Sequence, residues 1–252
     1  MSGTTATLEM KVKNIGATTK RLILNGGSSY SYAYDDQGNK YENTNLKLSF
    51  SNGTLTQYNC NTDIPAGVMT KMTIKIYNIY DEAAVLANIR INTNFGNSNG
   101  ELMLKNVELE GRTATALPTQ QTTGTVVTCD DNLEFTLIDC KAGANHTTLS
   151  FYAKNIGRAT GRLILNGGGS YSYAYDDEGN KYENANLKVS FADYSLTHYN
   201  CNTDIPSGVM VKCTIQISNV DANATEFSNI TIKTNFSNKN SELVFKNVKI
   251  RK

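Results

Sequence analysis

The feature that most constrains this chain is an internal duplication. Residues 8–110 align with residues 149–251 at a constant offset of 141 positions and without a gap, and about three aligned positions in five are identical. This repeat is much longer than the repeats of solenoid and propeller proteins, which run from about 20 to about 50 residues. The repeating unit is therefore a whole domain, and the sequence predicts two tandem domains that arose by duplication.

The duplication is incomplete at its first end. Residues 126–142 precede the second copy and contain the alternating segment Leu133–Ile138, which has no counterpart before the first copy. We expect repeat 1 to span residues 1–112 and to lack its first strand, a linker over 113–125, and repeat 2 over 126–252. A sheet without its first strand exposes unpaired N–H and C=O groups. Upstream residues or a strand from another chain would fill the gap, or the domain tolerates a shorter sheet.

Apolar and polar residues alternate through both copies, as in Leu8–Lys13, Met72–Ile76 and Ile89–Asn92. This period of two is typical of half-buried antiparallel strands. Clusters of Asn, Gly, Asp and Ser separate the strands at the intervals expected of turns. The sequence therefore predicts an all-β fold, in which each copy is an antiparallel, immunoglobulin-like β-sandwich.

Charge and hydropathy exclude two classes of partner. The chain has 24 Lys and Arg against 23 Asp and Glu, so it lacks the basic surface that nucleic acid requires. No apolar run reaches the roughly 18–20 residues that span a bilayer. The first ten residues contain no apolar segment of a signal peptide. The sequence is then that of a cytoplasmic or virion protein, or of a mature secreted chain.

Residues that could support catalysis are sparse. His146 and His198 are the only histidines, and neither recurs in the other copy. Hydrolases of the Ser-His-Asp or Cys-His type need a positioned base, and no phosphate-binding loop, HExxH or GxSxG motif occurs. We therefore predict that the chain is not an enzyme and that it needs no cofactor, with calcium as the one candidate ion.

The cysteines are distributed unevenly between the copies. Cys60 and Cys201 are equivalent, whereas three further cysteines occur only in the second copy. Four cysteines in one small domain favour a disulfide framework and an oxidising compartment. Free buried thiols and a zinc site are the alternatives, and zinc is disfavoured because no CxxC spacing occurs. The disulfide candidates are Cys129, Cys140, Cys201 and Cys213.

The longest nearly identical block is Arg21–Asn45 against Arg162–Asn186. Tyrosines alternate along it and would lie on one face of a strand, and an Asp-Asp-x-Gly-Asn turn follows. Three interpretations stay open: tyrosines that pack on the sandwich, a recognition face for a protein or glycan, and a calcium site. The candidate ligand-binding residues are Tyr30, Tyr32, Tyr34, Tyr41, Tyr171, Tyr173, Tyr175 and Tyr182. The candidate metal ligands are Asp35, Asp36, Asn39, Asp176, Asp177 and Asn180.

A second nearly identical block is Tyr58–Met69 against Tyr199–Met210. Its proline fixes φ and pushes the preceding isoleucine toward an extended conformation. We expect a rigid loop that leads into the next strand. By contrast, Tyr77–Ala87 and Ser218–Ser228 have diverged almost completely.

Three short motifs of the second copy resemble one known group of domains. Lys154–Gly157 follows a strand, Asp176–Tyr182 holds a D-x-x-G-x-x-Y turn, and Ile205–Gly208 precedes a valine-rich strand. In this order the motifs resemble the bacterial extracellular immunoglobulin-like (telokin-like) β-sandwich domains of unknown function, over nearly all of each repeat. The resemblance implies a secreted or surface-anchored interaction module without catalytic residues.

These observations lead to two hypotheses about function. The first is a non-enzymatic binding or adhesion module, extracellular or in the cell envelope, whose two copies of one site bind a protein or glycan with increased avidity. The alternative is a structural subunit of a fibre or surface assembly. In that case a strand of a neighbouring chain would fill the open edge of repeat 1, and the chain would associate with itself.

Overall fold

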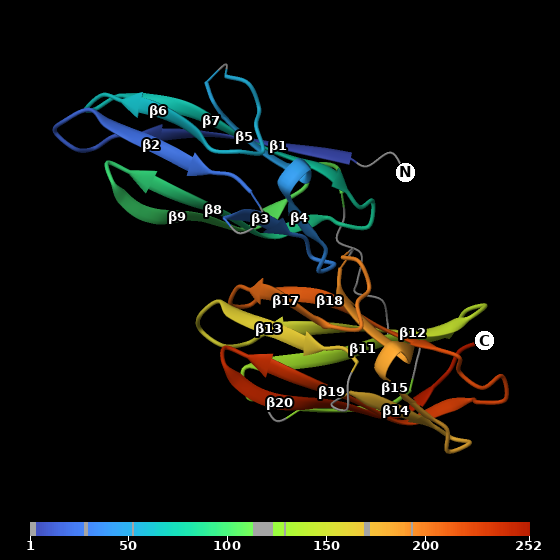
Figure 1. Cartoon of the computed structure of the whole chain (residues 1–252). Coiled ribbons are helices and arrows are strands. Elements are labelled where there is room, and N and C mark those ends of the chain that lie inside the picture. Colours follow the sequence, from blue (N-terminus) through green and yellow to red (C-terminus); the bar gives the residue numbers. More distant parts are fainter. Residues whose placement is uncertain are drawn as a thin grey trace. The chain divides into compact units, whose positions relative to one another are not determined.

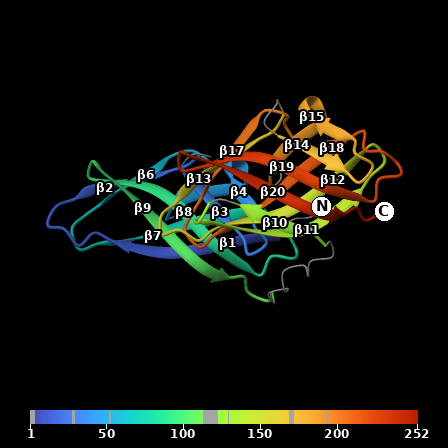
Figure 2. The same cartoon turned by 90° about the horizontal axis from the view of Figure 1, so that it is seen from below.

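The computed structural model describes residues 4–27, 30–51, 53–112, 123–128, 130–168, 172–192 and 194–252. The chain forms two compact units, unit 1 (Met1–Thr115) and unit 2 (Ala116–Lys252). Each unit consists of two layers of β-strands (Figures 1 and 2), with short 3-10 turns at Asn43–Asn45 and Asn184–Asn186. The prediction of an all-β fold is confirmed.

Unit 2 is a sandwich of two antiparallel sheets. The first sheet has the order β11 (Leu133–Ala142), β12 (His146–Asn155), β18 (Met210–Ser218), β16 (Leu187–Phe191). The second has the order β10 (Thr125–Thr128), β20 (Lys239–Lys249), β19 (Glu226–Phe236), β13 (Gly161–Asn166), β17 (Asn200–Ile205). Two short strands extend this sheet: β14 (Tyr173–Asp176) pairs with β19, and β15 (Lys181–Glu183) pairs with β14. The rings of Phe151 on β12 and Phe245 on β20 lie 5.0 Å apart between centroids, so the core lies between the sheets.

Unit 1 has the same arrangement with fewer strands. Its first sheet has the order β1 (Thr4–Lys13), β7 (Met69–Ile79), β5 (Leu46–Phe50). Its second has the order β4 (Lys40–Glu42), β3 (Ser31–Tyr34), β8 (Val85–Phe95), β2 (Lys20–Asn25), β6 (Cys60–Ile64), with β9 (Ser98–Glu108) paired to β8. One apolar cluster joins residues of both sheets, including Leu24, Ile74 and Ile89.

The alternating residues of the sequence face the core as the period of two predicts. On β18, Val211, Cys213, Ile215 and Ile217 are buried and the residues between them are partly exposed. This alternation allows each strand to add one apolar row to the core while its polar row stays in water. Among the described residues, no helix is long and apolar enough to cross a membrane.

The two units differ on one side of the sandwich. In unit 2, β11 pairs with β12 and β10 pairs with β20. Within the described part of unit 1, no strand takes either place, so β7 is the only strand neighbour of β1. Six apolar residues are consequently only half-buried in unit 1, whereas the aligned residues of unit 2 are fully buried. The pairs are Leu8 and Leu149, Met10 and Phe151, Val12 and Ala153, Leu102 and Leu243, Leu104 and Phe245, and Val107 and Val248.

The matched pair Leu8 and Leu149 gives a test of this difference. We expect Leu149→Ala to lower the free energy of unfolding by about 2–5 kcal/mol, because it leaves a cavity in a closed core. Leu8→Ala should cost about 1 kcal/mol, because that side chain is already half-exposed. Hydrogen exchange during urea unfolding measures each unit separately. Equal losses at the two positions would contradict a side that is open in unit 1 only.

Candidate functional site

The tyrosine hairpin places its residues on two opposite faces of the sheet. Ala33 pairs with Tyr41 across β3 and β4, and both side chains belong to the core of unit 1. Tyr32 and Tyr34 therefore lie on the outer face. Their rings meet edge to face with centroids 5.6 Å apart and an interplanar angle of 74°. In unit 2 the aligned rings of Tyr173 and Tyr175 have almost the same geometry, 5.8 Å and 75°. The alternation predicted from the sequence holds for these four tyrosines.

A lysine lies over each outer tyrosine pair. Lys181 Nζ is 5.5 Å from the ring centroid of Tyr173 and 2.6 Å from a carboxylate oxygen of Glu183. In unit 1, Lys40 is placed in the same way over Tyr32, at 4.9 Å. A cation over an aromatic face is attracted by the negative potential of the ring. Each tyrosine pair is therefore held beside a lysine that is itself ion-paired with a glutamate.

The exposure of the candidate tyrosines differs between the units. Tyr173 and Tyr175 are partly exposed, whereas Tyr32 and Tyr34 are buried. Tyr30 precedes β3 and is 54% exposed. Tyr171 lies outside the described residues. The outer tyrosine pair is therefore accessible to a ligand in unit 2 and not in unit 1.

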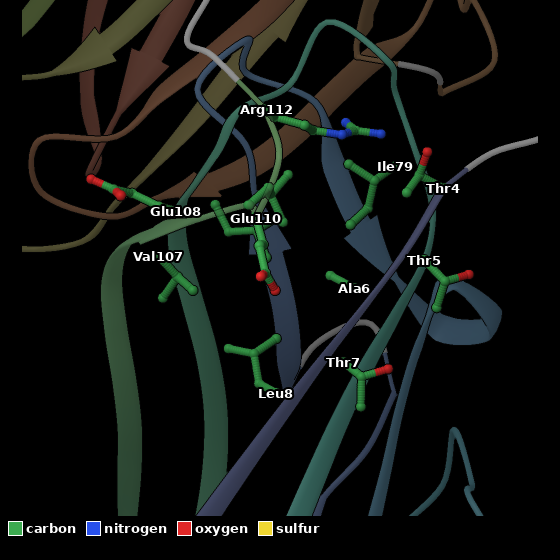
Figure 3. Close-up of a pocket in the computed structure, with 12 residues that line it drawn as sticks. Thr4, Thr5, Ala6, Thr7, Leu8, Ile79, Val107, Glu108, Glu110 and Arg112 are labelled. Carbon is green, nitrogen blue, oxygen red and sulfur yellow. The ribbon is translucent and has the colours of Figure 1, made fainter.

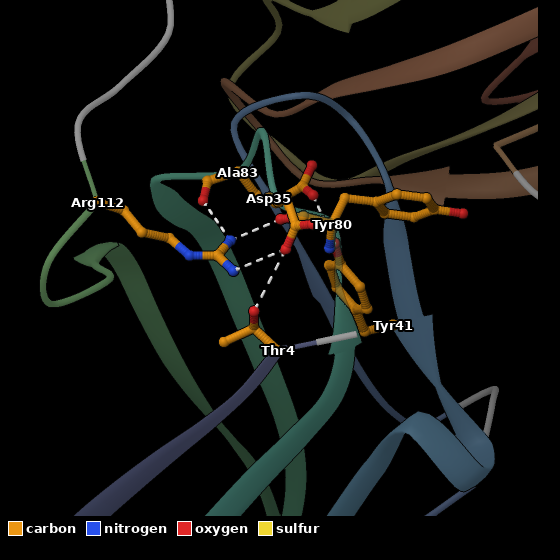
Figure 4. A network of polar contacts seen from close by, with 7 residues as sticks. Thr4, Asp35, Tyr41, Tyr80, Ala83 and Arg112 are labelled. Carbon is orange, nitrogen blue, oxygen red and sulfur yellow. Dashed lines mark hydrogen bonds and ion pairs between the residues drawn. The ribbon is translucent and has the colours of Figure 1, made fainter. Parts of the chain in front are cut away.

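Tyr41 does not join the outer tyrosines, because its hydroxyl lies in a polar network inside the hairpin turn (Figure 4). Tyr41 Oη donates to Asp35 Oδ2 at 2.6 Å and accepts from the backbone N–H of Tyr80 at 3.3 Å. Arg112 Nη1 donates to the carbonyl oxygens of Tyr80 and Ala83 at 2.6 and 2.7 Å. This network fastens the turn after β3 to the turn after β7, so Tyr41 has a structural role.

Unit 2 repeats the centre of this network. Tyr182 Oη donates to Asp176 Oδ2 at 2.5 Å and accepts from the Asp221 N–H at 3.0 Å. Burial and the Asp176 carboxylate raise the pKa of Tyr182 to about 12. Burial acts to raise the pKa of Asp176 as well, but hydrogen bonds from Tyr182 and Asn180 outweigh it and hold that pKa below its usual value. At Asp35 burial prevails, and its pKa is raised.

The candidate calcium ligands are already surrounded by donors. Asp35 accepts from the backbone N–H of Gln37 and from both the backbone and the side-chain amide of Asn39. Asp36 faces the other way and accepts from the N–H of Ala84. In unit 2, Asn180 likewise donates to Asp176, and Asp177 accepts from Thr225. A calcium ion could bind these carboxylates only by displacing such donors. In the described part of the chain, no three His, Cys, Asp or Glu side chains form a metal-binding group.

A hollow of about 450 Å³ lies in unit 2 where β13, β17, β19 and β20 adjoin, and sequence reasoning missed it. Its lining residues are Asn166, Gly167, Gly168, Asn200, Lys233, Thr234, Asn240 and Ser241. Tyr173 is not among these residues, but it pairs with Thr231, and Lys233 of the lining is the next residue of β19 on the same face. Residues in such diagonal positions are about 7–8 Å apart, within reach of an aromatic ring.

Two features of this hollow concern its polar atoms. Ser172 Oγ donates to the Asn166 carbonyl oxygen at 2.5 Å and accepts from the Lys233 N–H at 3.1 Å, which fixes β13 against β19. Ser241 Oγ is buried and has no hydrogen-bond partner among the described residues. Buried hydroxyl groups are rarely left without a partner, so this group is available to a ligand or a water molecule.

The two nearly identical sequence blocks meet at the edge of the hollow. A Cβ atom on Gly167 would lie 2.8 Å from the Tyr199 carbonyl oxygen, and one on Gly168 would lie 2.4 Å from that of His198. In unit 1, a Cβ atom on Gly26 would lie 2.3 Å from the Gln57 carbonyl oxygen. Only glycine permits this approach of two backbones. The sequence signal was the identity of both blocks, but it did not show that they are neighbours.

The disulfide prediction is wrong for the cysteines that the structure describes. Cys60, Cys140, Cys201 and Cys213 are all free thiols, and Cys129 lies outside the described residues. Burial raises the pKa of Cys60 to about 11 and those of Cys140 and Cys201 to about 12. The count of four cysteines in one domain misled because these side chains contribute to the core as small apolar groups.

Comparison with known proteins gives no family. The sequence matches no protein-family model and no curated protein. Among solved structures, a β-glucuronidase from Ruminococcus gnavus in complex with uronic deoxynojirimycin is similar with a TM-score of 0.24 and 12% identity, over 98% of this chain and 36% of that one. An anti-sigma factor domain-containing protein from Clostridium clariflavum has a TM-score of 0.24 and 8% identity, over 98% and 85%.

The CupB6 tip adhesin from Pseudomonas aeruginosa has a TM-score of 0.22 and 7% identity, over 95% of this chain and 88% of that one. The glucuronidase is a much longer protein, and this chain spans about a third of its length. Likenesses of this strength carry no argument about the fold family or the function.

The hydrogen-bonded pair Tyr182 and Asp176 predicts a specific loss of stability. Tyr182→Phe should lower the free energy of unfolding of unit 2 by about 1–3 kcal/mol, because Asp176 loses a donor and the Asp221 N–H loses its acceptor. Tyr173→Phe, on the outer face, is the matched control and should change it by less than about 0.5 kcal/mol. Urea unfolding measures both. Equal effects of the two variants would contradict the assignment.

The lowered pKa of Asp176 predicts how this stability depends on pH. Its ionised form is favoured by folding, so its contribution is complete above the pKa of an unfolded aspartate, about 4, and is lost as the pH falls through the lower folded pKa. Asp176→Asn should therefore destabilise unit 2 most at neutral pH, and the difference from the parent chain should shrink in acid. A difference that is constant from pH 7 to pH 2.5 would contradict it.

The free thiols predict the outcome of a simple titration. Unreduced protein in denaturant should yield at least four reactive thiols, and an intact mass without loss of hydrogen. In native protein near pH 7, labelling should be slow, because the raised pKa values keep the thiols protonated and the thiolate is the nucleophile. A recovery of three thiols or fewer from fresh protein would restore the disulfide hypothesis.

Proposed function

We propose that this chain is a non-enzymatic glycan-binding module whose main site lies in unit 2, with a related set of residues in unit 1. The observation that carries the proposal is the hollow of about 450 Å³ in unit 2, whose lining residue Lys233 lies diagonally opposite Tyr173 on β19. An extracellular or cell-envelope setting is part of the proposal, in keeping with the resemblance of the sequence motifs to extracellular immunoglobulin-like domains.

The side chains around the hollow suit carbohydrate. Asn166, Asn200 and Asn240 bring amides that both donate and accept hydrogen bonds, as vicinal sugar hydroxyls require. The ring of Tyr173 offers a flat apolar surface at low entropic cost for the C–H face of a sugar. Lys233 is ion-paired with Glu242, so the site has little net charge to favour an anionic ligand. In small-ligand sites a few placed polar groups fix the orientation of the ligand within a concave surface.

Most of this residue set recurs in unit 1. Asn166, Gly167, Gly168, Asn200, Thr234 and Asn240 align with Asn25, Gly26, Gly27, Asn59, Thr93 and Asn99. Lys233 and Ser241 align with Asn92 and Gly100. The two sites therefore share their amides and differ at two positions. Two related sites on one chain raise the avidity for a polymer that can reach both.

The test is a screen of the whole chain against an array of immobilised glycans, followed by titration of the best ligand. Tyr173→Ala should weaken binding by about tenfold or more, as loss of an aromatic contact at the centre of a site usually does. Asn166→Ala should weaken it as well. Ile156→Ala is the matched control, since it removes an exposed apolar side chain outside the hollow, and it should have no effect. Retention of no glycan, or binding that Tyr173→Ala leaves unchanged, would overturn the proposal.

A further inference from the structure

The open side of unit 1 forms a groove between the two sheets (Figure 3). A cavity of about 420 Å³ lies in it between β1 and the end of β9. Its lining residues include Ala6 and Leu8 from β1 and Val107 and Glu110 from the β9 end. Met10 and Val12 on β1, and Leu102 and Leu104 on β9, are also only half-buried and pack against the core of unit 1.

Unit 2 shows what occupies the corresponding place. There β11 contributes Leu133, Leu137 and Cys140, whose exposed fractions are 4%, 2% and 0%. The end of β11 also joins the two sheets. The Arg251 N–H donates to the Cys140 carbonyl oxygen, and the Ala142 N–H donates to the Arg251 carbonyl oxygen, both at 2.8 Å. Meanwhile β10 pairs with residues Leu243–Lys246 of β20.

The acceptor residues of unit 1 match this pattern. Glu110 aligns with Arg251 and lines the cavity, so its backbone lies where an incoming strand would bridge the sheets. Leu8 aligns with Leu149, the partner of Cys140. The N–H and C=O groups of β1 that point away from β7 lie on an edge without a strand neighbour among the described residues. An edge of this kind is a template for strand addition.

We propose that the open side of unit 1 is an acceptor for a strand pair of the β10 and β11 type, supplied in trans by another polypeptide. The incoming strands would pair antiparallel to β1 and to β9 in the register that unit 2 shows. They would bury the apolar row of unit 1 and fill its cavity. This inference is independent of the glycan site, which lies in unit 2.

Strand exchange between copies of this chain would not increase the number of closed units. The described chain contains one such strand pair, and unit 2 uses it. Exchange of this pair into unit 1 of a neighbour would open one unit 2 for each unit 1 that it closed. The buried apolar area would then not increase, and burial of that area is the driving force. Exchange of these strands is therefore unfavourable as the basis of a fibre of identical copies.

The facing residues specify the donor further. In unit 2, Glu134 faces Lys154 and Asp139 faces Ser150. Unit 1 keeps a lysine at the first position, Lys13, but has Glu9 at the second. Opposite charges across a strand pair stabilise it and like charges destabilise it. The donor strand should therefore carry apolar residues at the positions of Leu133, Leu137 and Cys140, an acidic residue opposite Lys13, and a basic or neutral residue opposite Glu9.

The test uses the whole chain and synthetic peptides of residues 123–142, in reductant. Fluorescence anisotropy should show saturable binding with one peptide per chain. An Asp139→Lys peptide should bind more tightly, because it removes the repulsion by Glu9. A Leu137→Asp peptide should bind at least about tenfold more weakly, because its apolar row is broken.

Chain variants locate the binding. Leu8→Asp should abolish peptide binding while its circular dichroism stays that of the parent, since Leu8 is only half-buried. Ile15→Ala, which removes a 92% exposed apolar side chain outside β1 and outside the cavity, should bind as the parent does. Absence of saturable binding, or equal binding by the Leu8→Asp chain, would overturn the proposal. A stable dimer by light scattering that excludes the peptide would also overturn it, since a second copy would then cover the groove.

Discussion

Burial of the inner faces of two facing sheets is the requirement on which both units depend. Unit 2 meets it on every side, because β10 and β11 cover the rows that contain Leu149 and Leu243. Unit 1 meets it only in part, since the same rows, with Leu8 and Leu102, stay half-buried. Exposed apolar area and an unpaired strand edge both cost free energy, and both are relieved by strand addition. The places and registers of β10 and β11 in unit 2 thus define the strands that unit 1 lacks.

The tyrosine hairpin separates structural from recognition roles within a few residues. Tyr41 and Tyr182 point inward and hold the turn through Asp35 and Asp176. Tyr173 and Tyr175 point outward, and Tyr173 lies diagonally opposite Lys233, which lines the hollow together with three asparagines. The inward set explains why the turn sequence is nearly identical in both copies without any ligand. The outward pair of unit 2 is partly exposed, unlike Tyr32 and Tyr34 in unit 1, and the proposed glycan site gives these exposed rings a role.

Local sequence patterns predicted the strands of this protein, but they did not predict which residues meet across the sheets. Alternation predicted the strands and the shared face of Tyr32 and Tyr34, because the pleat alone decides it. It did not predict that Tyr41 faces the core, since this depends on the register that pairs Tyr41 with Ala33. Cysteine counts indicated disulfides, but pairing requires distances that a sequence does not contain. The hollow was also missed, because it forms where Gly167 approaches the Tyr199 backbone across the sheet.

The central claim is that one side of unit 1 is open while the aligned side of unit 2 is closed. Amide hydrogen exchange of the free chain, followed by mass spectrometry, tests it most directly, because exchange reports local opening and solvent access. We expect the amide hydrogens of β1 to exchange much faster than those of β12, and those of β9 faster than those of β20, although the strands are aligned in sequence. Equally slow exchange in both members of each pair would show that the side of unit 1 is covered in solution and would contradict the account.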